Sequence, residues 1–102
     1  MKKDYVVKLR TGFFKTVTYQ MKVEKDQVAF LSMDTDDPIL LRYPRHEIQS
    51  IEVMISDNME FDFITKEQII SGFLVEYDES ERLIDRLKLC YEDRFYVDYR
   101  VI

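Results

Sequence analysis

The chain of 102 residues has one cysteine, one histidine, two glycines, two prolines and no tryptophan. A single cysteine excludes an internal disulfide, and we expect Cys90 to be a reduced thiol packed as a small hydrophobe in a cytoplasmic protein. Two glycines are too few for a glycine-rich phosphate cradle. The uncharged apolar runs span only a few residues, far below the roughly 20 needed to cross a bilayer. We therefore expect no transmembrane segment.

Groups that could perform chemistry are also scarce. His46 has no second histidine to share a metal ion or a proton relay, and a pairing with Cys90 would depend on an accident of folding. Asp34, Asp36 and Asp37 form an acidic loop, but it lacks the glycine and the bidentate glutamate of a calcium loop. The sequence therefore predicts no enzyme, no metal site and no cofactor.

The net charge of −5 at pH 7 weighs against nucleic acid, which requires a basic surface. The charges are unevenly distributed, since residues 1–25 hold seven of the 15 basic residues and only two of the 20 acidic ones. A basic edge on an acidic body suits an acidic partner. We favour the simpler interpretation, in which these charges are the solvated outward faces of strands.

Apolar and polar residues alternate in short segments, which is the pattern of strands with one buried face. The uneven alternation between Ile48 and Ile51 predicts a bulge at Gln49 and Ser50. Gly72 predicts a kink or a close crossing in the last of these segments, whose Phe73, Val75 and Tyr77 we expect to point inward. The predicted strands cover residues 5–10, 16–24, 28–33, 39–43, 48–55, 59–63 and 69–77.

The periodicity changes once, into an amphipathic helix predicted over residues 78–92. Asp78 and Glu81 have the spacing of a capping box at its start. One face of this helix is apolar and is expected to cover the open end of the sheet; it comprises Leu83, Ile84, Leu87, Cys90 and Tyr91. Alternation then resumes in a tail strand within residues 93–102.

The sequence thus predicts a mainly β (α+β) fold: a partly open antiparallel barrel of about seven strands, capped by one C-terminal amphipathic helix, with an extra terminal strand. The strand meander, the bulged segment from Tyr43 to Ile51 and the closing helix resemble the pleckstrin-homology-like superfold, in its small bacterial or GRAM-like variants. The resemblance covers about residues 5–92 of a single domain, 1–102. The tail, residues 93–102, lies beyond the family's normal end. The resemblance implies a binding or scaffold domain without catalysis.

Two groups of residues are candidate binding sites. Family members that bind phosphoinositides do so with basic residues around the first hairpin, a region that here holds Lys8, Arg10 and Lys15. Their order does not match the family's lipid-binding signature, so we keep phosphate-headgroup binding as an alternative and expect no membrane-surface binding. The second group is the tail, which carries apolar side chains on both faces; it includes Phe95, Tyr96, Tyr99, Val101 and Ile102.

An apolar terminal strand promotes aggregation unless it is paired. We therefore predict that the tail adds to a sheet edge, of its own chain or of a partner, and that the protein is a non-enzymatic interaction or scaffold domain which forms a homo-oligomer. The alternative function is a binder of a small apolar or acyl ligand within the curved sheet. Its adaptable lining would consist of Met21, Met33, Met54 and Met59.

Overall fold

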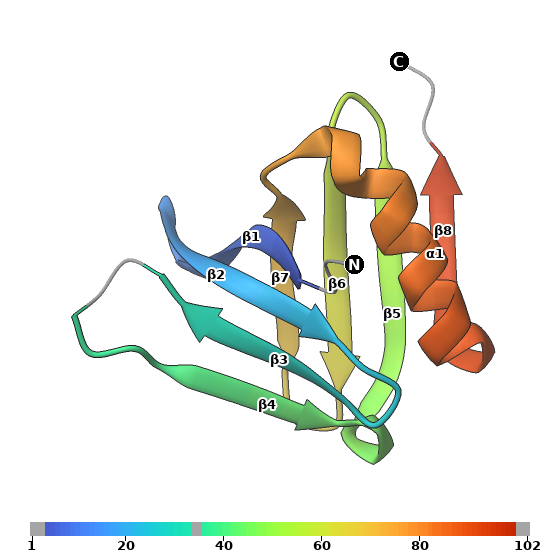
Figure 1. Cartoon of the computed structure of the whole chain (residues 1–102), viewed down its shortest axis with the longest axis horizontal. Helices are drawn as coiled ribbons and strands as arrows, with labels where there is room; N and C mark the ends of the chain where they lie inside the picture. The colour runs from blue at the N-terminus through green and yellow to red at the C-terminus, as the bar shows by residue number, and fades with distance from the viewer. Residues whose placement is uncertain (1–3, 34–35, 100–102) are drawn as a thin grey trace.

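The computed structural model describes residues 4–33 and 36–99, which form one open eight-stranded sheet in the order β4-β3-β2-β1-β7-β6-β5-β8 (Figure 1). One helix, α1, lies in front of β5 and β6 and crosses the face of the sheet. The elements are β1 (Asp4–Gly12), β2 (Lys15–Val23), β3 (Gln27–Ser32), β4 (Leu40–Pro44), β5 (Ile48–Ile55), β6 (Met59–Thr65), β7 (Ile69–Leu74), α1 (Ser80–Tyr91) and β8 (Phe95–Tyr99). Short 3-10 turns at Arg45–Glu47, Tyr77–Glu79 and Glu92–Arg94 join some of them.

The predicted mainly β fold with a C-terminal helix is confirmed, and so is the bulge, because the pairing of β5 with β6 shifts register between Ile48 and Ser50. The pairs among β1 to β7 are antiparallel. The expectation of an antiparallel sheet is wrong at one place, since β8 runs parallel to β5. Helix α1 returns the chain to the end of the sheet where β5 begins, and the strand that follows it must therefore run in the same direction as β5.

The core lies between the inner face of the sheet and α1. The five apolar helix residues predicted to face inward are all buried, which confirms that face. Phe30 occupies the centre of an aromatic cluster in which its ring meets those of Tyr19, Tyr43 and Phe63 edge to face, at centroid distances of 5.8 to 6.3 Å. This filled interior fixes the sheet as a rigid support for its outer surface.

The prediction for β7 is wrong in both its length and its parity. The strand ends at Leu74, and Val75 and Tyr77, which we expected inside, are exposed. Gly72 explains the parity, because a Cβ atom at this position would collide with the carbonyl oxygen of Lys8 and with Leu9. The predicted close crossing is therefore confirmed. It places the glycine on the inward side, so Phe73 next to it cannot point inward as predicted.

The predicted capping box is also wrong. A 3-10 turn precedes the helix, and Glu79 occupies the N-cap position without a side-chain capping hydrogen bond. The helix start is instead supported by an ion pair, in which Arg82 Nε donates to Glu79 Oε2 at 2.7 Å. Arg82 also lies over the ring of Tyr5, 4.4 Å from its centroid. The contact with Tyr5 attaches the first turn of α1 to β1.

Candidate functional site

The three basic residues predicted at the first hairpin lie on β1 and β2 and differ in their surroundings. Arg10 Nη2 donates to Glu60 Oε1 at 2.5 Å, and its guanidinium lies 5.6 Å from the ring centroid of Phe73. Lys8 is half-buried on β1, and Lys15 is exposed at the start of β2. Because an acidic partner already neutralises Arg10, this arrangement differs from a cluster of cations that converges on a phosphate.

Three of the tail residues named above, Phe95, Tyr96 and Tyr99, lie on β8. Phe95 is half-buried beside the core, whereas Tyr96 and Tyr99 are 61% and 63% exposed. Residues 95–99 pair with β5 of the same chain, so the predicted addition of the tail to a sheet edge takes place within the chain. Val101 and Ile102 lie outside the described residues.

An open groove of about 370 Å³ lies on the outer surface beside β8. It is lined mainly by alternate residues of β5, β6 and β8, and Arg10 closes one side. Asp62 accepts a hydrogen bond from Ser71 Oγ at 2.6 Å, which fixes one carboxylate of the wall. We call this hollow the acidic groove, because four of its lining residues are acidic: Glu52, Glu60, Asp62 and Asp98. Met54 and Tyr96 also contribute to the lining.

The tip of the β1–β2 hairpin carries two aromatic residues that the sequence analysis did not single out. Phe13 and Phe14 form a two-residue turn between the paired Gly12 and Lys15. Phe13 is 96% exposed and Phe14 is fully exposed, with the two ring centroids 6.2 Å apart. Phe14 also adopts a φ of 58°, a conformation that favours glycine or asparagine and costs a larger residue about 1 kcal/mol. Two adjacent aromatic residues directly after a turn glycine were the signal for this site in the sequence.

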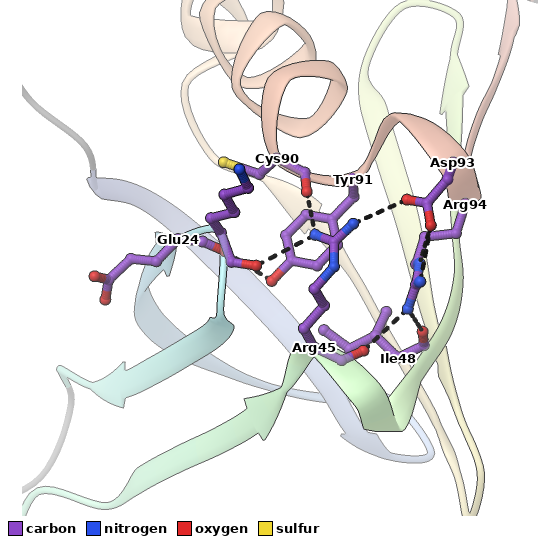
Figure 2. Close-up of polar contacts among 8 residues, drawn as sticks. Glu24, Arg45, Ile48, Cys90, Tyr91, Asp93 and Arg94 are labelled. Carbon is purple, nitrogen blue, oxygen red and sulfur yellow. Dashed lines mark hydrogen bonds and ion pairs between the residues drawn. The ribbon is translucent and has the colours of Figure 1, made fainter.

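A polar cluster joins the end of α1 to the start of β5 (Figure 2). Arg45 donates to the carbonyl oxygens of Cys90 and Lys25 and, at 3.0 Å, to Asp93 Oδ1. Its guanidinium lies 4.9 Å from the ring centroid of Tyr91. We call the set of Arg45, Tyr91, Asp93 and Arg94 the Arg45–Arg94 clamp.

Arg94 completes this clamp from the other side. Its Nη1 donates to the carbonyl oxygens of Arg45 and Ile48 at 3.1 and 3.0 Å, and its Nη2 donates to Asp93 at 2.8 Å. The hydrogen bond from Arg94 lowers the pKa of Asp93. The clamp thus fixes the turn before β8 against the start of β5, and it directs β8 along β5.

Tyr91 is the buried member of the clamp. Its hydroxyl donates to the carbonyl oxygen of Glu24 at 2.7 Å, and burial raises its pKa to about 12. The clamp's donors are thus bonded to carboxylate or carbonyl groups of the protein itself, with a neutral phenol between them. This arrangement is typical of a structural joint, because a binding site would keep polar groups available for its ligand.

The remaining candidates are dispersed. Met21 and Met59 are fully buried, Met54 is half-buried and Met33 is 52% exposed, so these residues do not line one hollow. Cys90 is buried on α1. Across residues 4–33 and 36–99, no group of three or more histidine, cysteine, aspartate or glutamate residues is placed to hold a metal ion. In the same part of the chain, no helix has the length and apolar character needed to span a membrane.

Comparison with known proteins adds no assignment, since no protein-family model matches the chain and no curated protein is similar enough to count as a relative. The function must therefore be argued from the surfaces described above.

Proposed function

We propose that this protein is a non-enzymatic interaction domain of the pleckstrin-homology-like type, and that it self-associates through the β8 end of its sheet. The observation that carries the proposal is the exposure of Tyr96 and Tyr99 on a strand at the end of the sheet order. Among the described strands, β8 pairs with β5 alone. Its second edge is a template on which another chain can pair.

Two features support this end of the sheet as a binding surface. The Arg45–Arg94 clamp holds β8 in place, so a partner meets a preformed strand and does not have to order it. Tyrosine is enriched at protein interfaces, because its ring supplies contact area at little cost in conformational entropy. An isolated exposed tyrosine is ordinary, but two on one short edge strand favour an interface.

The pleckstrin-homology-like assignment is supported by the order of the elements. Strands β1 to β4 and β5 to β7 form two antiparallel meanders that join where β1 pairs with β7, an amphipathic helix covers them, and β8 follows as an addition. Interaction domains need a rigid support with exposed edges and loops, and this fold offers both.

The test is the oligomeric state of a double variant, Tyr96→Ser with Tyr99→Ser, measured by sedimentation velocity over a range of protein concentrations. We expect the parent to form dimers or larger species and the variant to remain monomeric. Because both side chains are exposed, the free energy of unfolding of the monomer should change by less than about 1 kcal/mol.

The matched control is Leu89→Ser, which removes a 74% exposed apolar side chain from α1. It should leave the oligomer unchanged. A parent protein that is monomeric at every concentration, or a control variant that dissociates as readily as the double variant, would contradict the proposal.

A further inference from the structure

We infer that the surface which a second copy brings to the β8 end is the tip of its β1–β2 hairpin, and that Phe13 and Phe14 bind in the acidic groove. This inference rests on the proposed self-association and names the two surfaces that meet. The partner is thus a second copy of this chain.

The hairpin tip breaks two local rules at one place. Phe13 and Phe14 present their rings to solvent, and Phe14 holds a positive φ that glycine would adopt without strain. A sequence usually agrees with its fold at each position, and the places where it does not are most often functional. A pair of exposed aromatic rings on a rigid hairpin is a suitable anchor for a pocket on a partner.

The charges of the two surfaces are complementary. Residues 5–23, which span the hairpin, contain no acidic residue and, besides the Arg10 that lines the groove, three lysine residues, whereas the chain as a whole has a net charge of −5. Lys15 follows Phe14 directly. On the other surface, Glu52 is exposed and Asp62 is half-buried in the groove wall. Opposite charges on two surfaces of one chain favour the contact and fix its orientation.

The groove also has the right size and lining. A cavity of roughly 150 Å³ holds one benzene ring, so the groove's volume of about 370 Å³ has room for two phenyl rings. Met54 and Tyr96 offer adaptable apolar contacts to those rings. The walls around them are acidic, which leaves Lys15 of the hairpin close to carboxylates when the rings are bound.

A hairpin does not fill the groove of its own chain. Arg10, near the end of β1 that leads into the tip, already lines the groove and forms an ion pair with Glu60, while Phe13 and Phe14 stay exposed. The rings of one copy are therefore available to the groove of another. Each copy carries both surfaces. Because the contact joins two molecules, the extent of association depends on protein concentration.

The first experiment removes the rings. In the double variant Phe13→Ser with Phe14→Gly, the glycine accepts the positive φ and the turn is retained. We expect the dissociation constant of self-association, measured by sedimentation velocity, to rise by roughly 100-fold, as for the loss of aromatic anchors at an interface. Leu89→Ser is again the control, with no expected change.

The second experiment exchanges the charges. Lys15→Glu and Glu52→Lys should each weaken association by roughly 10-fold, and the double variant that carries both should recover most of the loss. Mixing then separates tip-to-groove contact from tip-to-tip contact: the Phe13→Ser, Phe14→Gly protein retains its groove and should bind a Tyr96→Ser protein, which retains its tip. Absence of rescue, or absence of binding in the mixture, would overturn the inference.

The two proposals can fail separately. If Tyr96→Ser with Tyr99→Ser dissociates the oligomer but the ringless tip does not, self-association through β8 stands and the tip is not the bound segment. Retention of a monomeric parent on phosphatidylserine vesicles, lost without the rings, would contradict both proposals and assign the tip to a membrane surface.

Discussion

The side chains of the Arg45–Arg94 clamp are bonded within the protein, whereas those at the tip of the β1–β2 hairpin are exposed to solvent. In the clamp, arginine, tyrosine and aspartate side chains bond to one another and to carbonyl oxygens. At the tip, two aromatic rings lie in solvent and one of them holds a strained backbone conformation. The cluster richest in functional groups is thus a joint within the fold, and the candidate binding element is a place where local stability has been given up.

Among the variants of these two regions, a variant of Arg45 should show the largest change in the free energy of unfolding. Arg45→Ala leaves the carbonyl oxygens of Cys90 and Lys25 without their donor and removes the guanidinium from the Tyr91 ring. We expect the free energy of unfolding to fall by about 2 kcal/mol, since a partly buried network loses its central member. Urea denaturation followed by circular dichroism measures this.

Arg45→Lys provides the control for charge. A single ammonium cannot reproduce the fork of bonds that a guanidinium makes, so most of the loss should remain. A decrease below about 1 kcal/mol for Arg45→Ala, small even for a single ordinary hydrogen bond, would mean that the clamp is not a structural joint and that its groups are available for another role.

The two regions also differ in how far the sequence predicts them. Alternation predicts strands and the buried face of α1, because burial on one side imposes a period on the residues. It does not predict the clamp, since Arg94 and Arg45 lie 49 residues apart and meet only when the fold is complete. The parity of β7 depends on the close approach of Gly72 to the carbonyl oxygen of Lys8 and the side chain of Leu9, which no local pattern records.

The candidate site is predicted only in part, because it too combines a local pattern with contacts that form between distant residues. The alternation of the tail indicates a strand, and Tyr96 and Tyr99 follow from it, but the parallel pairing with β5 requires the position of α1. The acidic groove combines residues of the β5–β6 hairpin with residues of β8, which is distant from them in sequence. Phe13 and Phe14 are adjacent in the sequence, yet their full exposure is known only when the hairpin is seen to extend away from the core.

An intermediate effect is expected when the buried hydroxyl of the clamp is removed. Tyr91→Phe loses the hydrogen bond to the carbonyl oxygen of Glu24 and should cost about 1 kcal/mol at pH 7. The parent should also lose stability in alkali. Burial raises the pKa of Tyr91 to about 12 in the folded protein, while the unfolded chain has the ordinary value near 10.

The direction of this pH effect follows from proton binding. Between about pH 10 and 12 the folded state keeps a proton that the unfolded state releases, so stability falls as the pH rises. Burial raises the pKa of Tyr5 and of Tyr43 as well, so some of the decline should persist in Tyr91→Phe. The urea midpoints of the two proteins should be measured at pH 8, 10 and 11. If the midpoint falls equally steeply with pH in the parent and in Tyr91→Phe, the assignment of the effect to Tyr91 is contradicted.

The smallest effect, and one of opposite sign, is expected at the hairpin tip. Phe14→Gly releases the strain of a positive φ, although it also gives the unfolded chain more freedom. The two contributions leave a net gain of about 0.5 kcal/mol in the stability of the monomer. Thermal unfolding at concentrations below the dissociation constant measures it without a contribution from association.

Phe14→Asn tolerates the same φ and should behave alike, whereas Phe14→Val should destabilise the turn. If Phe14→Gly instead lowers stability by more than about 1 kcal/mol, the ring supports the hairpin itself, and the contrast between a structural clamp and a functional tip is lost.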